Sequence, residues 1–222
     1  MVVKVRRPEA PVVVEPDLGI LERLALRLQR STRWGRAAGT VDLAHGFGDA
    51  LREELDLRVE ERNMTSVAAA AALRGGTGVR IPVPVGPMPT RRVLVMERLD
   101  GQPLSTIKPG MLSADRNALA RSLLDCLLRE VMVDGVFHAV PHPGNVFLLC
   151  GGQLGLLDFG SVGRIDAGMR AALQRLLLAV DHGDPATLTD ALLEIVERPE
   201  DLDEDQLHRS PGRFLARHVA AA

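Results

Sequence analysis

Residues 138–160 read HAVPHPGNVFLLCGGQLGLLDFG, and this stretch decides the fold. It begins with a polar loop at residues 140–145 and ends with the tripeptide DFG at residues 158–160. Between them lie two short apolar segments on either side of a Gly-Gly pair, a pattern typical of a tight hairpin. We therefore predict strands at residues 146–149 and 154–157, which return the chain to its starting point.

The hairpin brings together two polar side chains that are thirteen residues apart, Asn145 and Asp158. Amide and carboxylate oxygens are hard ligands, which suit Mg²⁺ held against phosphate groups. A DFG tripeptide alone is weak evidence, and the alternative is an ordinary turn with a capping Asp. An Asn one hairpin upstream of DFG strengthens the case, so the sequence predicts a metal site formed by Asn145 and Asp158.

The same stretch resembles a known family. Residues 138–145, HAVPHPGN, resemble the catalytic loop of the UbiB/AarF atypical kinases, which usually reads HADPHPGN. Residues 156–160 resemble the metal-binding segment of that family. Residues 93–97 resemble the strand that enters the kinase hinge, and Val2–Val5 resembles the Val-Ala-Ile-Lys strand whose lysine holds the phosphates. The resemblance covers residues 1–170.

A third segment carries the resemblance further. Glu54 and Asp56 resemble the Glu-x-Asp signature of the family, and Glu60 resembles the glutamate that pairs with the strand lysine. The resemblance implies an ATP molecule with Mg²⁺, bound by Lys4 and the acidic residues Glu54, Asp56, Glu60 and Glu97. The resemblance also implies a role in ubiquinone or other isoprenoid-lipid metabolism at membranes.

The implied fold class is α+β, a protein-kinase-like two-lobe fold. We expect an incomplete N-lobe at residues 1–98 and a mostly helical C-lobe at residues 99–222, with a hinge at residues 97–101. The family carries a Lys-x-Gly-Gln segment and an alanine-rich phosphate-covering loop before its strand lysine. Met1 precedes Lys4 by three residues, so we expect both to be absent, together with the strands that pair with this one.

Residue spacing supports a pairing of Lys4 with Glu60. Asp56, Glu60 and Asn63 lie at i, i+4 and i+7, so they share one face if residues 48–73 form a single helix. The alternative is a charged, solvated face, and for Lys4 a frayed surface position. A lysine fixed by a carboxylate can hold phosphate as a point charge, and we therefore expect this ion pair.

Val140 stands where the family has its catalytic Asp. Valine cannot accept a proton, and the loss of a general base typically costs about 10²–10⁴-fold in rate. His138 and His142 flank this position. Either could substitute as a base, but the favoured interpretation is that they hold the loop by hydrogen bonds.

The pattern predicts further elements along the chain. They are a helix from Asp17, a break at residues 39–43, strands at residues 81–85 and 93–97, a loop at residues 99–110, a helix capped by Ser113 and stopped by Gly135, and helices after residue 160 with loops at residues 181–185 and around Pro199.

Composition limits the classes of partner. The 222 residues carry a formal net charge of −2 with 3% aromatic residues, which argues against nucleic-acid binding by bulk charge or base stacking. Two distant cysteines, Cys126 and Cys150, suggest a reducing cytoplasm. No apolar run reaches the roughly 20 residues that span a bilayer. We expect a cytoplasmic protein, or one bound peripherally at the membrane.

Three functions follow from these observations. The first is an ATP-binding member of the family with weak or no phosphotransfer, a pseudokinase or a truncated product. The second is a working small-molecule kinase or ATPase in isoprenoid-quinone or lipid metabolism. The third is a non-enzymatic module that binds lipid or a partner protein. Val140 argues against the second, and retention of Asn145, Asp158, Lys4 and Glu60 favours the first over the third.

Overall fold

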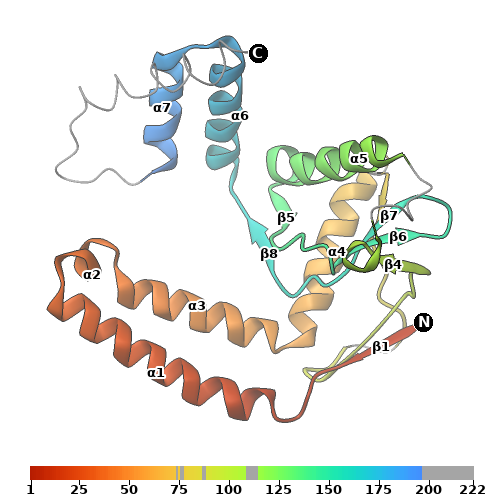
Figure 1. The fold of residues 1–222 in the computed structure, drawn as a ribbon, viewed down its shortest axis with the longest axis horizontal. Coiled ribbons are helices and arrows are strands. Elements are labelled where there is room, and N and C mark those ends of the chain that lie inside the picture. The colour runs from red at the N-terminus through yellow and green to blue at the C-terminus, as the bar shows by residue number, and fades with distance from the viewer. Residues whose placement is uncertain (74, 76–77, 87–88, 109–114, 197–222) are drawn as a thin grey trace. The chain divides into compact units, whose positions relative to one another are not determined.

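The computed structural model describes residues 1–73, 75, 78–86, 89–108 and 115–196 (Figure 1). The chain separates into two compact units, of which the first contains the predicted site residues. The predicted lobe boundary stays a prediction.

The first unit comprises residues 1–126 and 138–162. Its helices are α1 (Ala10–Ser31), α2 (Arg33–Ala37), α3 (Thr40–Glu54) and α4 (Leu57–Leu73), and α5 (Arg116–Arg129) begins in it. Its strands are β1 (Val2–Val5), β2 (Val79–Arg80), β3 (Val93–Met96), β4 (Gly101–Pro103), β6 (Val146–Leu149) and β7 (Leu154–Leu156).

Strand β1 forms where the sequence predicts it, and it has a partner. It pairs antiparallel with β3, so that Lys4 lies opposite Leu94. The expectation that the pairing strands are absent was therefore wrong, because a strand far along the sequence supplies the ladder. The pairing fixes the position of the Lys4 backbone beside α4, which packs against β3.

A second sheet carries the predicted hairpin. Its strand order is β2-β7-β6-β4, with β6 and β7 antiparallel and Val146 opposite Leu156. The hairpin is thus confirmed, and Gly151 and Gly152 both adopt the positive φ that its turn requires. The predicted loop at residues 99–110 instead contributes β4 and a 3₁₀ turn, Leu104–Thr106.

The strand predicted at residues 81–85 was largely wrong. The strand in this region is β2, and beyond it the segment makes one isolated bridge, between Pro84 and Met96. Pro82 and Pro84 have no backbone N–H to donate, so the segment cannot form a continuous ladder.

Two helix predictions also need correction. The helix expected from Asp17 begins at Ala10, because a proline in the first turn lacks only an N–H that has no helical partner. The single helix expected over residues 48–73 is two helices, α3 and α4, separated by Leu55 and Asp56. The Asp56 carboxylate accepts a hydrogen bond from the Arg58 backbone N–H at 3.1 Å and caps α4.

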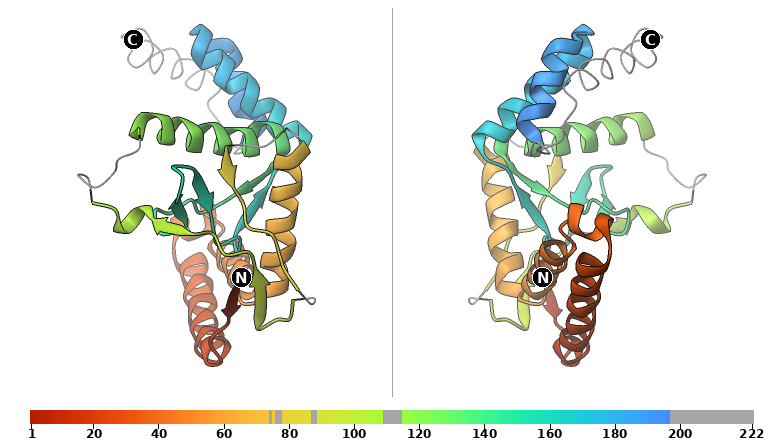
Figure 2. Two further views of the ribbon diagram at one scale, coloured as in Figure 1. Left: turned by 90° about the vertical axis from the view of Figure 1, so that its right-hand side faces the viewer. Right: turned by 90° about the vertical axis from the view of Figure 1, so that its left-hand side faces the viewer.

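Helices α1 and α3 form a hairpin that α2 closes. Both views of Figure 2 show the red and orange helices running alongside each other. The Thr40 hydroxyl donates to the Ala25 carbonyl across this contact at 3.0 Å. Thr32 ends α1 and caps α2, since its side chain accepts from the Gly35 N–H.

The second unit comprises residues 127–137 and the described residues from Gly163 on. It contains a π-helix at Glu130–Asp134 and helices α6 (Ala167–His182) and α7 (Pro185–Ile195). Strands β5 (Val136–His138) and β8 (Val162–Arg164) pair with each other.

Sequence signals for these helix ends are partly confirmed. Gly135 ends the π-helix with a φ of 70°, as its predicted role as a stop requires. Asp184 caps α7 within the loop predicted at residues 181–185. Ser113 and Pro199 lie outside the described residues.

Candidate functional site

A lysine and two carboxylates form the centre of the site. The ammonium group of Lys4 on β1 lies 2.7 Å from Glu60 Oε1 on α4 and 3.0 Å from Asp158 Oδ1, which follows β7. Glu60 is nearly fully buried, with 4% of its side chain exposed, whereas Lys4 and Asp158 are 35% and 43% exposed. The predicted pairing of Lys4 with Glu60 is confirmed, and the structure adds Asp158 to it.

The environment shifts the pKa of both partners upward. Burial lowers the pKa of Lys4, but its hydrogen bonds and the negative charges of Glu60 and Asp158 more than offset this. Burial raises the pKa of Glu60, and the nearby Asp158 charge adds to the rise. Lys4 therefore stays cationic at neutral pH, and Glu60 depends on Lys4 for its stability as an anion.

Asp158 adopts an unusual backbone conformation. Its φ is 66°, and among the described residues it is the only non-glycine with a positive φ. Such a conformation costs about 1–3 kcal/mol and persists only where surrounding contacts enforce it. Those contacts come from the next residue, since Phe159 is 1% exposed and its carbonyl accepts from Asn63 Nδ2 at 3.0 Å.

Both histidines hold the loop in the structure. The buried His138 accepts at Nδ1 from the Val140 N–H at 3.2 Å, so that its Nε2–H donates to the Leu157 carbonyl at 3.1 Å. His142 accepts at Nδ1 from the Gly144 N–H at 3.1 Å. With both nitrogens of His138 occupied, this imidazole is bound to the backbone on each side.

The loop and the hairpin are joined by backbone hydrogen bonds. The Leu157 N–H donates to the Asn145 carbonyl at 2.8 Å, and the Asn145 N–H donates to the His142 carbonyl at 2.7 Å. These bonds keep Asn145 next to Leu157, which directly precedes Asp158 in the chain. The two predicted metal ligands are thus brought to one place.

Two cavities meet at Asp158. A cavity of about 250 Å³ is lined by Phe47, Ala50, Leu51, Glu54, Val140, Asn145, Asp158 and Ser161. A second cavity, of about 340 Å³, is lined by Lys4, Val5, Arg6, Leu51, Glu54, Leu55, Leu57, Glu60, Asp158 and Gly160. Glu54 and Asp158 face both, so a ligand in one cavity is in reach of the acidic groups of the other.

The oxygen donors around these cavities fit Mg²⁺. Asn145, Asp158 and Glu54 supply an amide and two carboxylates, the ligand types that this ion prefers. A Cβ on Gly160 would lie 3.2 Å from the Glu54 side chain and 3.4 Å from Asp158 Oδ1, so Gly160 leaves the space between the two acids open. Within the described ranges, no group of three or more His, Cys, Asp or Glu side chains is arranged to hold a metal unaided.

Asp56 and Glu97 lie outside this cluster. The Asp56 carboxylate binds Arg58 at 2.7 Å and Arg91 at 3.4 Å, and these contacts hold its pKa below the ordinary value. Glu97 pairs with Arg80. Neither lines the two cavities at Asp158, so their predicted contact with a nucleotide stays a prediction.

Phe47 and Ser161 line the site without having been predicted. Ser161 directly follows the DFG tripeptide, and that adjacency was a signal available in the sequence. Phe47 had no such signal, because its place depends on how α3 packs near the loop that contains Val140 and Asn145. Val140 is 51% exposed and faces the same cavity.

None of the helices in the described part of the chain is long and apolar enough to cross a membrane.

The chain is similar to known proteins in sequence and in fold. Residues 1–192 match the family model of the ABC1 atypical kinase-like domain. An uncharacterized protein from Synechocystis is 29% identical over 225 residues, which cover 97% of this chain and 55% of that protein. The probable protein kinase UbiB of Marinobacter nauticus is 30% identical over 190 residues, covering 83% of this chain and 34% of that protein.

An uncharacterized Mycobacterium tuberculosis protein, Rv0647c, is 34% identical over 187 residues, or 81% of this chain and 37% of its own length. The chain therefore spans about half or less of the curated relatives it matches. Among solved structures, Rv3197 of the same organism, in complex with erythromycin, is similar with a TM-score of 0.64 at 23% identity. That match covers 96% of this chain and 54% of the other.

Proposed function

Because the chain belongs to the ABC1 atypical kinase-like family, whose α+β kinase-like fold the structure confirms, we propose that it binds Mg-ATP but transfers phosphate weakly or not at all. The observation that carries the proposal is the position of Lys4, whose ammonium group lies 2.7 Å from Glu60 and 3.0 Å from Asp158. A charged lysine fixed in this way beside oxygen ligands is a phosphate-binding arrangement.

Each residue has a distinct role in the proposal. Lys4 binds phosphate oxygens and is oriented by Glu60, whose buried carboxylate lies 2.7 Å from the ammonium group. Asn145 and Asp158 hold the metal, with Glu54 beside them. Mg²⁺, when bound, neutralises negative charge on the phosphates. Asn63 and His138 fix the backbone on either side of Asp158 and so keep its carboxylate in place.

The loss of turnover follows from Val140. Its side chain lies at the cavity wall beside Asn145 and Asp158, where a general base would receive the proton of an attacking hydroxyl. An aliphatic group there forgoes about 10²–10⁴-fold in rate. His138 is an unsuitable substitute, because both of its ring nitrogens are engaged by the loop backbone.

The proposal extends, on the family resemblance, to a cytoplasmic location with peripheral contact to the membrane, and to isoprenoid lipid as a further partner. A role in ubiquinone biosynthesis would follow from the same resemblance. A wholly non-enzymatic module is disfavoured by the strained Asp158 and the retained Lys4–Glu60 pair.

A thermal-shift titration tests the nucleotide site. A ligand that binds only the folded state stabilises it by about 2.7 kcal/mol at a concentration 100 times its Kd. We expect Mg-ATP to raise the melting temperature of the wild type, and Asp158→Ala to abolish the rise. Asp100→Ala is the matched control, since Asp100 is an exposed acid that pairs with Arg98. Equal shifts in wild type and Asp158→Ala would show that the nucleotide binds elsewhere.

A further inference from the structure

Arg6 is a second cation in the cavity that contains Lys4. Its backbone N–H donates to the Arg92 carbonyl at 2.9 Å, so it continues the pairing of β1 with β3 by one residue. Side chains two residues apart on a strand point to the same face. Lys4 and Arg6 therefore share a face, and both line the cavity of about 340 Å³ that extends to Asp158.

One nitrogen of the Arg6 guanidinium is fixed by a hydrogen bond. Its Nη1 donates at 2.7 Å to the carbonyl of Leu55, which directly follows α3. The last carbonyls of a helix have no helical donor and carry partial negative charge, so they favour a cation. Because Leu55 also lines the cavity, this hydrogen bond holds the head group of Arg6 at the cavity wall.

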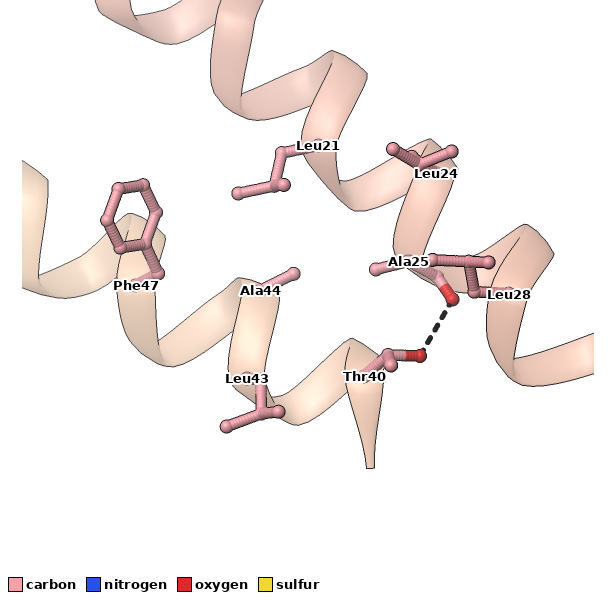
Figure 3. A pocket seen from close by; sticks show the side chains of 8 residues that line it. All are labelled: Leu21, Leu24, Ala25, Leu28, Thr40, Leu43, Ala44 and Phe47. Carbon is pink, nitrogen blue, oxygen red and sulfur yellow. Dashed lines mark hydrogen bonds between the residues drawn. The ribbon is translucent and has the colours of Figure 1, made fainter. Parts of the chain in front are cut away.

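The helix that provides this anchor is itself supported. Ala25 on α1 and Ala44 on α3 are buried, and the Thr40 hydroxyl donates to the Ala25 carbonyl at 3.0 Å (Figure 3). Larger apolar side chains, Phe47 among them, line a cavity of about 380 Å³ beside this contact (Figure 3). The Leu55 carbonyl thus follows a helix that is held in place independently of Arg6.

The Arg6 Nε is enclosed without a hydrogen-bond partner. In the part of the chain that the structure describes, it is the only buried side-chain nitrogen or oxygen without one. A buried donor of a charged group that lacks an acceptor is strongly disfavoured, and such groups are rare in folded proteins. A ligand that supplies an acceptor to this nitrogen would therefore stabilise the chain.

This nitrogen belongs to the edge of the guanidinium that recognises oxyanions. The N–H groups of Nε and Nη2 point in parallel, which matches two oxygens of one phosphate or carboxylate. Nη1, on the other edge, is taken by Leu55. Since Nε is enclosed and the Arg6 side chain as a whole is only partly buried, the guanidinium must turn about the Leu55 hydrogen bond to present this edge to the cavity.

The charge balance of the cavity favours a phosphate ligand that arrives with Mg²⁺. Lys4 and Arg6 are the cations of its lining. Three carboxylates line it as well, those of Glu54, Glu60 and Asp158. A bare anion is repelled by this excess of negative charge, whereas a magnesium-bound polyphosphate brings a cation for the acids and oxygens for Arg6. Without Arg6, one cation would face the three acids.

From these contacts we propose that Arg6 is a second phosphate-binding residue of the site. Its guanidinium turns about the bond to Leu55 and donates from Nε and Nη2 to oxygens of a polyphosphate. The identity of this ligand rests on the proposed function, whereas the unpaired Nε and the two cations of the cavity do not. Lys4 supplies a point charge, and Arg6 adds paired donors of fixed geometry.

Calorimetric titration with Mg-ATP and with magnesium tripolyphosphate tests the proposal. We expect Arg6→Gln to weaken the binding of both ligands by about 10–150-fold, the range produced by loss of hydrogen bonds to a charged group. Arg6→Lys keeps the charge and loses the paired donors, so its affinities should lie between those of the wild type and Arg6→Gln. Arg7→Gln is the matched control and should match the wild type, because Arg7 is exposed and lines neither cavity at Asp158.

A purely structural role of Arg6 gives a different result. Loss of the hydrogen bond to Leu55 would then lower the melting temperature of Arg6→Gln and leave both affinities unchanged, which would overturn the proposal.

NMR of the arginine Nε–H groups provides a second readout, in the wild-type chain. Saturating magnesium tripolyphosphate should shift the Arg6 Nε–H signal downfield, because this N–H gains a charged acceptor. The Arg7 signal should stay in place. Arg6→Lys identifies the Arg6 signal by its absence, and an Arg6 signal that does not move at saturation would overturn the proposal.

The two ligands separate this proposal from the proposed function. Tripolyphosphate binding that Arg6→Gln weakens, without binding of Mg-ATP, would support the role of Arg6 and refute the nucleotide site. Equal Mg-ATP affinities of the wild type, Arg6→Gln and Arg6→Lys would overturn the role of Arg6 and leave the nucleotide site standing. Failure of the wild type to bind either ligand would refute both.

Discussion

Replacement of Lys4 by methionine isolates the energetics of the site, because methionine keeps most of the side-chain length and removes the charge. In the wild type, the ammonium group pairs with two carboxylates, one of them buried. The variant leaves Glu60 in a buried position without its cation and close to the negative charge of Asp158. We expect a clear loss of folding stability.

The magnitude can be bounded from the distances. At an effective dielectric constant of about 20, charges 2.7 Å and 3.0 Å apart attract by about 6 and about 5.5 kcal/mol before any cost is subtracted. Removing one partner of a fully buried pair costs about 3–5 kcal/mol. Lys4 is 35% exposed and Asp158 is 43% exposed, and solvent screening reduces the loss to about 2 kcal/mol.

The loss should depend on pH in a defined direction. The pKa of Glu60 in the folded chain is raised above its ordinary 4.5. Protonated Glu60 therefore contributes to folding stability. This contribution is fully present below pH 4.5 and disappears as the pH rises through the pKa of Glu60 in the folded chain. Without Lys4 this pKa rises further, so Lys4→Met should cost more stability at about pH 8 than at about pH 5.

Urea unfolding at the two pH values measures this effect, with Lys108→Met as the matched control. Lys108 is exposed, and its replacement should change stability by less than about 0.5 kcal/mol. An unfolding free energy for Lys4→Met equal to that of the wild type would refute the reasoning. A larger loss at the lower pH would contradict the role assigned to Glu60.

The remaining predictions concern the frame of the site. Gly101→Ala should lose about 2–3 kcal/mol by urea unfolding, because its Cβ would meet backbone of a neighbouring strand, whereas Gly19→Ala, in an open helical position, should gain about 0.5–1 kcal/mol. Equal changes in the free energy of unfolding for Gly101→Ala and Gly19→Ala would contradict the close contact of Gly101 with the neighbouring strand. Asn63→Ala should lower the free energy of unfolding by about 1–3 kcal/mol and weaken Mg-ATP binding, since it leaves the buried Phe159 carbonyl without this donor. An unchanged affinity of Asn63→Ala for Mg-ATP would show that Asn63 does not support the nucleotide site. His138→Ala should lower the free energy of unfolding by about 2–4 kcal/mol, and His142→Ala, at an exposed residue, by less than about 1 kcal/mol. A larger loss for His142→Ala than for His138→Ala would exclude His138 as the main support of the loop.

The sequence predicted those features that a short pattern or the family resemblance specifies. The β6–β7 hairpin follows from two apolar segments around Gly151 and Gly152. The pairing of Lys4 with Glu60 was predicted from resemblance and spacing, and it is confirmed at 2.7 Å. In both cases the chemistry of a few residues determines the arrangement.

Features that depend on competing local signals were predicted poorly. Apolar spacing through Leu55 suggested one helix over residues 48–73, but the Asp56 carboxylate caps a new helix at Leu57. The pairing of β1 with β3 could not be read from β1 alone, because its partner lies some ninety residues further along the sequence. The place of Phe47 between two cavities depends on helix packing, which no local pattern of the sequence records.

The central claim, a bound nucleotide with little or no turnover, is tested most directly by ADP release in the presence of Mg-ATP. The chain should be measured beside Asp158→Ala, at protein concentrations where the thermal shift shows that nucleotide is bound. The account predicts that wild type and Asp158→Ala release ADP at the same background rate, since Val140 supplies no base. Substantial magnesium-dependent release by the wild type, lost in Asp158→Ala, would contradict it and would indicate His142 as the first base to test.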